Sequence, residues 1–332
     1  MKTLNQFKRT AIAGVATATL GMTLATPAQA DLFAYAKLLL EDFTILGSDG
    51  ELLDAGPGGD FSFLSFTSSG DMNGDLTGTG GFSFSVPSTG GDIDFPSSCL
   101  SVTGDCNPLA ENALPFLTGA QGADYVAADQ IQVGSPILGL GLASPANVGA
   151  LAVGSLSTTS GAGSANANNG LEASWQFSLT QDTGITFEGD ISVYLEAFAS
   201  AGELSPGKAS AATEFGITIT NLTTGEVVFN SADELGGDVP SQTTAADAGG
   251  FPVDITTCGG LAALTGGSCG TELNTSFSFT TVALEAGTLY QLSARNNVNI
   301  DIAREAPVPG VLALMGAGLL GIFAFGRRRA QV

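Results

Sequence analysis

The sequence predicts an all-β protein, an antiparallel β-sandwich with a jelly-roll-like winding. Apolar and polar residues alternate at the period of a half-buried strand, as in Phe61–Phe66, Phe82–Val86 and Trp175–Leu179. Turn residues recur at short intervals between such segments, and no stretch between residues 31 and 305 has the period of a long helix. Strands without covering helices bury their apolar faces by packing sheet on sheet.

Most of the expected elements are strands separated by turns. Asp31–Leu46 mixes alternation with an unbroken leucine run, and its aromatic and β-branched residues favour strand over helix. Asn221–Glu226 has the composition of a hairpin turn that leads into Val227–Phe229. The other strands are expected at Leu171–Leu179, Ile185–Phe187, Ile191–Ala199, Phe215–Ile219, Phe277–Thr280 and Leu289–Arg295.

The region from about 97 to 170 has weaker patterning and is expected to be a loop-rich insertion. Ala123–Asp129 could form a short helix and Gly134–Leu142 a strand. Ser155–Gly170 consists of small polar residues, which suits a flexible linker or, in its last third, a strand that continues into Leu171.

The N-terminus has the three parts of a secretory signal peptide. Lys2, Lys8 and Arg9 precede the apolar stretch Ala11–Leu24, and Ala28-Gln29-Ala30 is a small-x-small cleavage site. Residues 1–30 are therefore expected to be removed during export, because the apolar stretch is too short for a stable membrane span. An extracytoplasmic domain then covers residues 31–305.

The C-terminal residues 306–332 have the layout of a membrane anchor. An uncharged apolar run, Val311–Gly326, is followed by the basic residues Arg327, Arg328 and Arg329. The run is slightly shorter than the usual 20 residues, but snorkelling arginines can make up the difference. Basic residues after the apolar run place the C-terminus in the cytoplasm and the preceding domain outside. We therefore expect a single transmembrane helix in the inner membrane.

The residues before this run resemble a known sorting signal. Ala306, Pro307, Val308, Pro309 and Gly310, followed by the small-residue apolar run and the arginine cluster, are similar to the C-terminal signal of PEP-CTERM proteins. Val308 stands at the position of the glutamate in that motif. The resemblance implies an exported protein sorted by an exosortase-type transpeptidase to the cell surface or the extracellular space, with extracellular polysaccharide as a partner.

Composition narrows the possible functions. Residues 31–306 hold all 32 acids of the chain and only Lys37, Lys208, Arg295 and Arg304 as bases, so their formal charge is −28. Such a surface repels nucleic acid, which binds to basic patches. The chain has no histidine, which removes the usual general base and metal ligand. Catalysis by two carboxylates is the remaining route, and we expect that the protein is not an enzyme.

Four cysteines form two local pairs, Cys99 with Cys106 and Cys258 with Cys269. An exported chain meets an oxidising compartment, so disulfides are expected. Local pairing is the simplest of the three possible connectivities. A zinc site would need closer spacing or histidines.

Asp71, Asn73 and Asp75 match the first three ligand positions of a calcium loop, and they are expected to lie in a loop between two strands. Leu76 and Phe82 replace the glycine and the glutamate that such a loop requires, so an Asx-type turn explains the same residues. Calcium is the one cofactor that the sequence suggests.

Two functions are therefore weighed. The first is a non-enzymatic surface or extracellular-matrix protein, held or sorted by its tail. The alternative is a calcium-assisted carbohydrate-binding module, with Trp175, Tyr194 and Tyr290 as candidates for stacking on a sugar. The alternation around Trp175 predicts that this side chain faces the core instead.

Overall fold

The computed structural model describes residues 32–88, 92–102, 112, 114–115, 124–157, 163–199, 207–231 and 267–304. The predicted signal peptide (residues 1–30), the sorting signal and anchor (residues 306–332), Cys106 and Cys258 lie outside the described residues.

The described part of the chain is almost entirely β-structure, in two six-stranded antiparallel sheets. This confirms the predicted all-β class and is consistent with a β-sandwich. The first sheet has, in order, β11 (Gly267–Thr280), β8 (Thr186–Ala199), β1 (Leu32–Leu46), β6 (Ala146–Leu156), β5 (Tyr125–Val133) and β4 (Ile93–Ser101). The second has β10 (Val227–Asn230), β9 (Gly207–Asn221), β12 (Tyr290–Arg304), β7 (Gly163–Leu179), β2 (Phe61–Leu76) and β3 (Gly80–Ser88).

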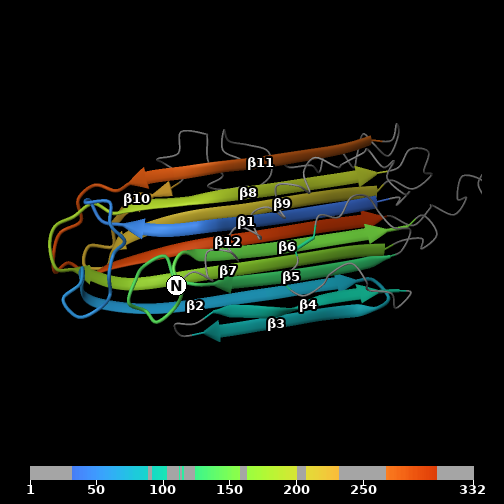
Figure 1. Ribbon diagram of the computed structural model, residues 1–332. Helices are drawn as coiled ribbons and strands as arrows, with labels where there is room; N and C mark the ends of the chain where they lie inside the picture. Colours follow the sequence, from blue (N-terminus) through green and yellow to red (C-terminus); the bar gives the residue numbers. More distant parts are fainter. Residues whose placement is uncertain are drawn as a thin grey trace, which may run out of the picture.

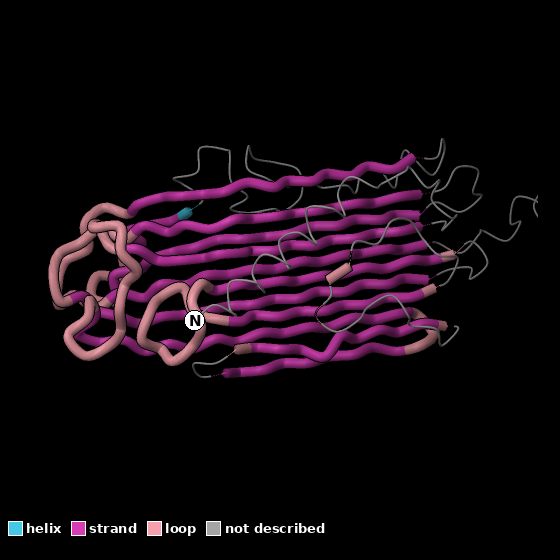
Figure 2. The backbone as a smooth tube through the Cα atoms, viewed as in Figure 1, coloured by secondary structure: helices cyan, strands magenta, loops and turns pink. Residues whose placement is uncertain are grey.

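The two sheets lie face to face with their strands aligned. β8 contacts β9, β1 contacts β12, β6 contacts β7, β5 contacts β2 and β4 contacts β3. The strands of both sheets run along one long direction (Figure 1), as in aligned sandwiches. Figure 2 shows the larger described loops gathered at one end of this long axis.

The core lies between the sheets and follows the strand alternation. On β7, for example, Leu171, Trp175, Phe177 and Leu179 face inward and are buried, which confirms the prediction for Trp175. One buried polar side chain crosses between the layers. Asn169 on β7 donates from its amide nitrogen to the backbone oxygens of Asp129 on β5 and Leu151 on β6. The two sheets are therefore joined by hydrogen bonds as well as by apolar packing.

A β-bulge in β1 explains why its sequence pattern is mixed. The register of β1 against both neighbouring strands shifts between Leu40 and Thr44, and Asp42 has a φ of 52°. Before the shift the even-numbered residues such as Leu38 face the core, and after it Phe43 and Ile45 do. The extra residue moves the inward face by one position. The apolar residues of β1 thus stay on the core side along its length.

The outer face of the first sheet carries a second apolar cluster. It consists of Phe33, Tyr35, Leu114, Tyr125, Ala127, Leu151 and Val153. The segment at Leu114 and Pro115 is held against β1, because the Tyr35 hydroxyl donates to the Pro115 oxygen (2.8 Å) and Lys37 Nζ donates to the Leu114 oxygen (2.7 Å). β1 is therefore buried on both faces near its start, which accounts for its continuous apolar run.

The region at 97–170, which was expected to be a loop-rich insertion, contains β5, β6 and the first half of β7 among its described residues. The strand expected in the last third of Ser155–Gly170 is part of β7. β5 takes the place of the short helix expected at Ala123–Asp129: its alanines are buried against both neighbouring strands, and this tertiary pairing overrides their helix propensity. The strand expected at Gly134–Leu142 is an irregular connection, in which Gly134, Gly139 and Gly141 have positive φ.

Removing a core ring tests whether the packing between the sheets stabilises the fold. Phe187 on β8 is fully buried and packs against Phe43, Phe229 and Phe279. Phe187→Ala is expected to lower the free energy of unfolding by about 3–5 kcal/mol. Urea denaturation, followed by the fluorescence of Trp175, the only tryptophan, measures this loss.

The control for this variant is Phe63→Ala, which removes the same ring from a residue that is 47% exposed. Its expected loss is below about 1 kcal/mol. Similar losses for the two variants would contradict the described packing.

Candidate functional site

The outer face of the second sheet is a broad surface of hydrogen-bonding side chains. Because alternate residues point to opposite faces, each strand that buries apolar residues inward places polar residues outward. We call this surface the polar face. Its members are Ser65, Thr67, Ser69, Asp71, Asn73 and Asp75 on β2, Asn166, Glu172, Ser174 and Gln176 on β7, Gln291, Ser293, Arg295, Asn297, Asn299 and Asp301 on β12, and Ser210, Glu214, Thr218 and Thr220 on β9.

The strand register arranges these residues in rows across the sheet. One row consists of Thr67, Ser174, Ser293 and Thr218, and the next consists of Ser65, Gln176, Gln291 and Thr220. Neighbours in a row lie about 4.8 Å apart, and successive rows lie about 6.8 Å apart. The Gln291 amide nitrogen donates to the Ser174 hydroxyl at 3.1 Å, which joins the two rows. The polar face thus presents donors and acceptors at regular spacing.

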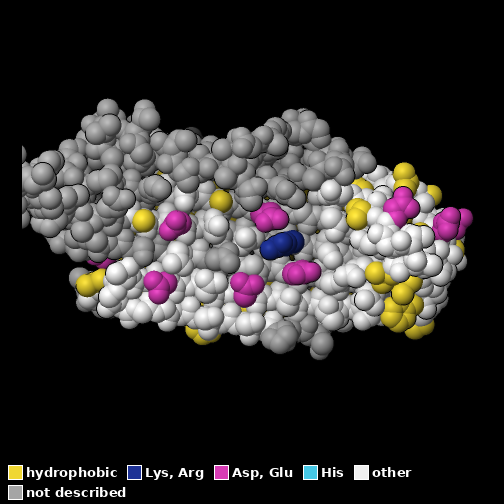
Figure 3. All heavy atoms as spheres, turned by 180° about the vertical axis from the view of Figure 1, so that it is seen from behind, with side chains coloured by type: hydrophobic (Ala, Val, Ile, Leu, Met, Phe, Trp, Pro, Cys, Tyr) yellow, Lys and Arg dark blue, Asp and Glu magenta, His cyan; other side chains and the backbone are white. Residues whose placement is uncertain are grey.

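The charges on the polar face are mainly negative. Arg295 on β12 is exposed, and its register partner on β7 is Glu172. Figure 3 shows this arrangement as a mostly neutral surface with scattered acidic side chains around one basic group. The remaining acids are Asp71, Asp75, Glu214 and Asp301. Such a face can hydrogen-bond neutral hydroxyl groups and attract cations, and it repels anions.

The structure places the calcium candidates Asp71, Asn73 and Asp75 in β2. The expectation that they lie in a loop is wrong, because β2 runs without interruption to Leu76. The three side chains share the polar face, but Asp75 lies four residues after Asp71, which is about 13 Å along an extended strand. Calcium–oxygen bonds are about 2.3–2.6 Å long, so the three cannot bind one ion while β2 is intact. Within the described residues, no group of three or more His, Cys, Asp and Glu is arranged to hold a metal.

The aromatic candidates for stacking on a sugar are separated from one another. Trp175 and Tyr290 are 4% and 3% exposed and belong to the core between the sheets. Tyr194 lies on the outer face of the first sheet, on the side of the molecule opposite the polar face, where it packs edge-on against Tyr35. The three therefore do not form a common platform.

Of the predicted disulfide residues, Cys99 and Cys269 lie in β4 and β11. Cys99 is disulfide-bonded. The pairings of Cys99 with Cys106 and of Cys258 with Cys269 stay predictions.

Ionisable side chains on the outer face of the first sheet have shifted pKa values. Burial raises the pKa of Glu196 above its ordinary value, and a hydrogen bond from the Tyr194 hydroxyl (2.9 Å) partly offsets this shift. Burial also lowers the pKa of Lys37, against the opposing effect of Glu41. The pKa of Tyr35 is raised, chiefly by burial. Tyr35 belongs to the second apolar cluster, and Lys37 and Glu196 lie beside it, where charge is costly.

Sequence reasoning identified three residues of the polar face, but not the face itself. The signal was present as alternation in Ser65–Asp75, Glu172–Gln176 and Gln291–Asp301, which marks the outward residues of each strand. What the sequence does not contain is the pairing of these distant segments as neighbours. Only the sheet register brings them together.

No helix in the described ranges has both the length and the apolar character needed to cross a membrane. Comparison with protein-family models, with curated proteins and with solved structures finds no match to this chain.

Replacing Glu196 by glutamine should change how stability depends on pH. Because the folded-state pKa is raised above the ordinary value of 4.5, the folded protein keeps this proton to a higher pH than the unfolded chain does. The stability that the protonated carboxyl contributes is therefore complete below pH 4.5 and is lost as pH rises through the folded-state pKa. In Glu196→Gln this loss should be absent, since glutamine stays neutral and can still accept from Tyr194.

Thermal unfolding measured from pH 4 to pH 8 checks this expectation. The variant should be at least as stable as the parent near pH 7, and its curve should be flatter over this range. Glu188→Gln, at a half-buried carboxyl nearer the other end of β8, is the matched control. A variant curve parallel to that of the parent would contradict the assigned shift.

Proposed function

We propose that this chain is an exported, non-enzymatic protein of the cell surface or extracellular matrix that contacts polysaccharide through the polar face. The observation that supports it best is the polar face itself, four adjacent strands of outward Ser, Thr, Asn, Gln and acidic side chains in regular rows. Hydroxyl-rich polymers offer donors and acceptors at repeated intervals, and a flat array of polar side chains can hydrogen-bond to many of them at once.

The acidic residues narrow the kind of polymer. Asp71, Asp75, Glu172, Glu214 and Asp301 face outward with Arg295 on this surface. Like-charge repulsion disfavours an anionic polymer, so the polysaccharide is neutral or carries amino groups.

Export and anchoring are supported by the terminal segments. The signal peptide at residues 1–30 would direct the chain across the inner membrane, and the tail at residues 306–332 would hold it there through one transmembrane helix. The PEP-CTERM-like motif from Ala306 to Gly310 would present it to an exosortase-type transpeptidase, after which the domain resides at the cell surface or is released.

A jelly-roll-like winding is the finer part of the fold proposal. In a jelly roll a long antiparallel ribbon is rolled up, so that its first strand lies beside its eighth and its second beside its seventh. Here β1 pairs with β8, β2 pairs with β7 and β4 pairs with β5, which supports such a winding for the first eight strands. The pairings of β3 with β2 and of β6 with β1 depart from it.

Deleting residues after Arg304 tests the role of the tail. The full chain is expected in the envelope fraction or, after processing, with a C-terminus near Pro307. The truncated chain should appear almost entirely in the medium. Cell fractionation with intact-mass and C-terminal sequencing measures both. An unchanged distribution between envelope and medium would rule out the proposed anchoring.

Removing side chains from the polar face tests its role in binding. The triple variant Gln176→Ala, Gln291→Ala and Ser293→Ala should weaken co-sedimentation with polysaccharide purified from the producing cells. A net loss of about 0.5–1.5 kcal/mol per hydrogen bond predicts that affinity falls by tenfold or more.

The matched control removes three exposed hydroxyls elsewhere, as Thr223→Ala, Ser278→Ala and Thr280→Ala. It should bind as the parent does. Equal loss in both variants, or no loss in either, would count against the polar face as the contact surface.

A further inference from the structure

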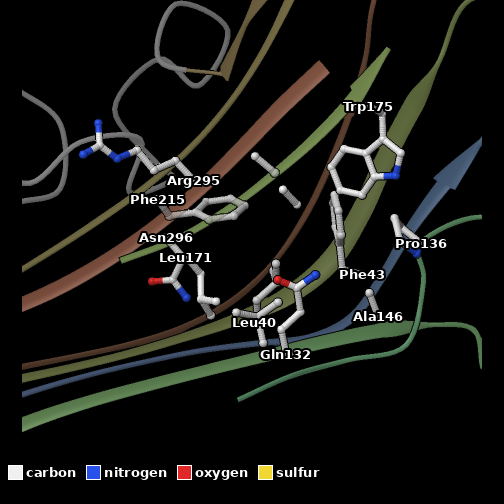
Figure 4. A pocket seen from close by; sticks show the side chains of 13 residues that line it. Leu40, Phe43, Gln132, Pro136, Ala146, Leu171, Trp175, Phe215, Arg295 and Asn296 are labelled. Atoms are coloured by element: carbon white, nitrogen blue, oxygen red, sulfur yellow. The ribbon is translucent and has the colours of Figure 1, made fainter. Parts of the chain in front are cut away.

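A small cavity between the two sheets has a volume of about 30 Å³. Its lining is almost wholly apolar, with Leu40, Phe43 and Trp175 among its walls (Figure 4). Ala173 and Ala294 are register partners in this lining, and side chains this small leave part of the space of about 10 Å between packed sheets unfilled. Binding sites for small molecules are about tenfold larger or more. The cavity is therefore an incompletely packed part of the core, and a binding partner has to be sought at the surface.

Three of the four edge strands of the sheets are poorly suited to pairing with another chain. An edge strand presents free backbone N–H and C=O groups, which can bond to a strand of another molecule. The edge strand β10 has only four residues. The edge strand β4 contains Pro96, which has no N–H, and its register against β5 shifts between Phe95 and Ser98. On the edge strand β11, Phe277 and Phe279 are buried and offer little apolar surface.

The fourth edge strand, β3, has none of these protections along most of its length. It has nine residues, pairs with β2 without a register shift, and lies at the margin of the molecule in Figure 1. Its side chains Phe84 and Val86 are 37% and 38% exposed. Pro87, next to the end of the strand, limits the free edge to the residues before it. Among the described strands β3 pairs only with β2, so its other edge is open.

The two sides of β3 differ in chemistry. The apolar residues Phe82, Phe84 and Val86 alternate with Ser83 and Ser85. The register against β2 places the apolar residues on the inner side of the sheet, where Phe84 is the partner of the buried Met72. The two exposed serines lie on the outer side and extend the polar face. The open edge thus has an apolar side and a hydroxyl side.

A second copy of this chain matches that pattern. A two-fold axis that passes through the sheet at Phe84 makes two β3 strands antiparallel neighbours. Phe82 of one copy then lies opposite Val86 of the other, and Ser83 lies opposite Ser85. Apolar side chains meet apolar ones on the inner side, and hydroxyls meet hydroxyls on the outer side. The strand is therefore complementary to itself.

Charge restricts where two copies can meet. The chain has a net charge of −22, so the acidic surfaces of two copies repel each other. No charged residue lies between Asp75 and Asp92, a segment that includes all of β3. In the two-fold pairing, Asp71 on neighbouring β2 would be about 14 Å or more from its counterpart, beyond the screening length of about 8 Å at physiological salt. The edge at β3 thus lets two acidic copies approach each other.

We propose that the chain forms a two-fold dimer in which β3 pairs with β3 of a second copy. The second sheets of the two copies join into one continuous sheet, and Phe84 and Val86 of both copies become buried. Both polar faces lie on the same side of this sheet, so the outward rows of hydrogen-bonding groups continue from one copy to the other. The two copies run in opposite directions along their long axes. The pairing therefore joins copies that have been released from the membrane, which is the one point that rests on the proposed function.

Sedimentation of the full chain in detergent solution tests for this dimer. We expect a reversible mixture of monomer and dimer in which the dimer fraction rises with protein concentration. Hydrogen exchange of the backbone amides in Phe82–Val86 should slow as the dimer forms, because free N–H groups gain acceptors. A chain that stays monomeric would leave this edge to another kind of partner, and the proposal would be wrong. A dimer that forms without any slowing of exchange in β3 would also overturn it.

Two matched valine variants locate the interface. Val86→Lys places an ammonium group at the paired edge and should raise the dissociation constant of the dimer by about tenfold or more, because the charge is buried without a partner. Val227→Lys is the control, because Val227 is 54% exposed and lies in β10, at the opposite margin of the same sheet. It should dimerise as the parent does. A dimer that resists Val86→Lys, such as one held by the apolar tail, would contradict the proposal, as would equal weakening in both variants.

A pair of phenylalanine variants replaces this test if Val86→Lys does not fold. Phe84→Ser removes the ring at the two-fold axis and should also weaken the dimer by about tenfold. Phe63→Ser is its control, since Phe63 is similarly exposed but lies in β2, which is not an edge strand. Unchanged affinity in every folded β3 variant would show that the copies meet elsewhere, and the proposal would be wrong.

Discussion

The packing of two apolar sheet faces against each other is the interaction on which the rest of this domain depends. It is uneven along the sandwich. Phe187 and the three phenylalanine rings that contact it fill the space between the sheets at one place, whereas Ala173 and Ala294 leave a hollow beside Trp175. The same alternation that buries these residues sends the intervening polar ones to the opposite surface. The core and the polar face thus result from the same alternation. A shift of one residue in the register of a strand would change both, because it moves every side chain of that strand to the other face.

Much of the fold follows from local sequence, and the exceptions have physical causes. Alternation around Trp175 predicts β7 and its inward face because each strand there buries only one side. The same reasoning fails at β5, where both faces are buried and alanines give no period. It also fails at Asp71–Asp75, because aspartate and asparagine favour turns until pairing with β3 and β7 supplies partners for the backbone. Where the local preference is weak or favours another structure, the pairing with neighbouring strands determines the secondary structure.

The candidate site was predictable residue by residue but not as a surface. Outward positions such as Ser174 and Ser293 can be read from each strand, yet their adjacency depends on the order β9-β12-β7-β2, in which the paired residues of β7 and β12 are more than 100 residues apart. The cavity was harder to foresee. It requires that Asn296, an ordinary polar residue in the sequence, faces inward near Ala294 on its own strand and Ala173 on neighbouring β7. Local pattern fixes which way a residue faces along its strand, and topology fixes its neighbours.

The start of β1 and the end of β12 lie at the same end of the sandwich. Gly154 pairs with Ala34 near the start of β1, and the nearest side chains to it across the core are those of Ile300 and Ile302, near the end of β12. Strands of about 15 residues extend about 50 Å from that end. The proposed anchor beyond Arg304 would hold the sandwich with its long axis pointing away from the membrane. The polar face would then be open to the side along its whole length, where the proposed polysaccharide could pass along it.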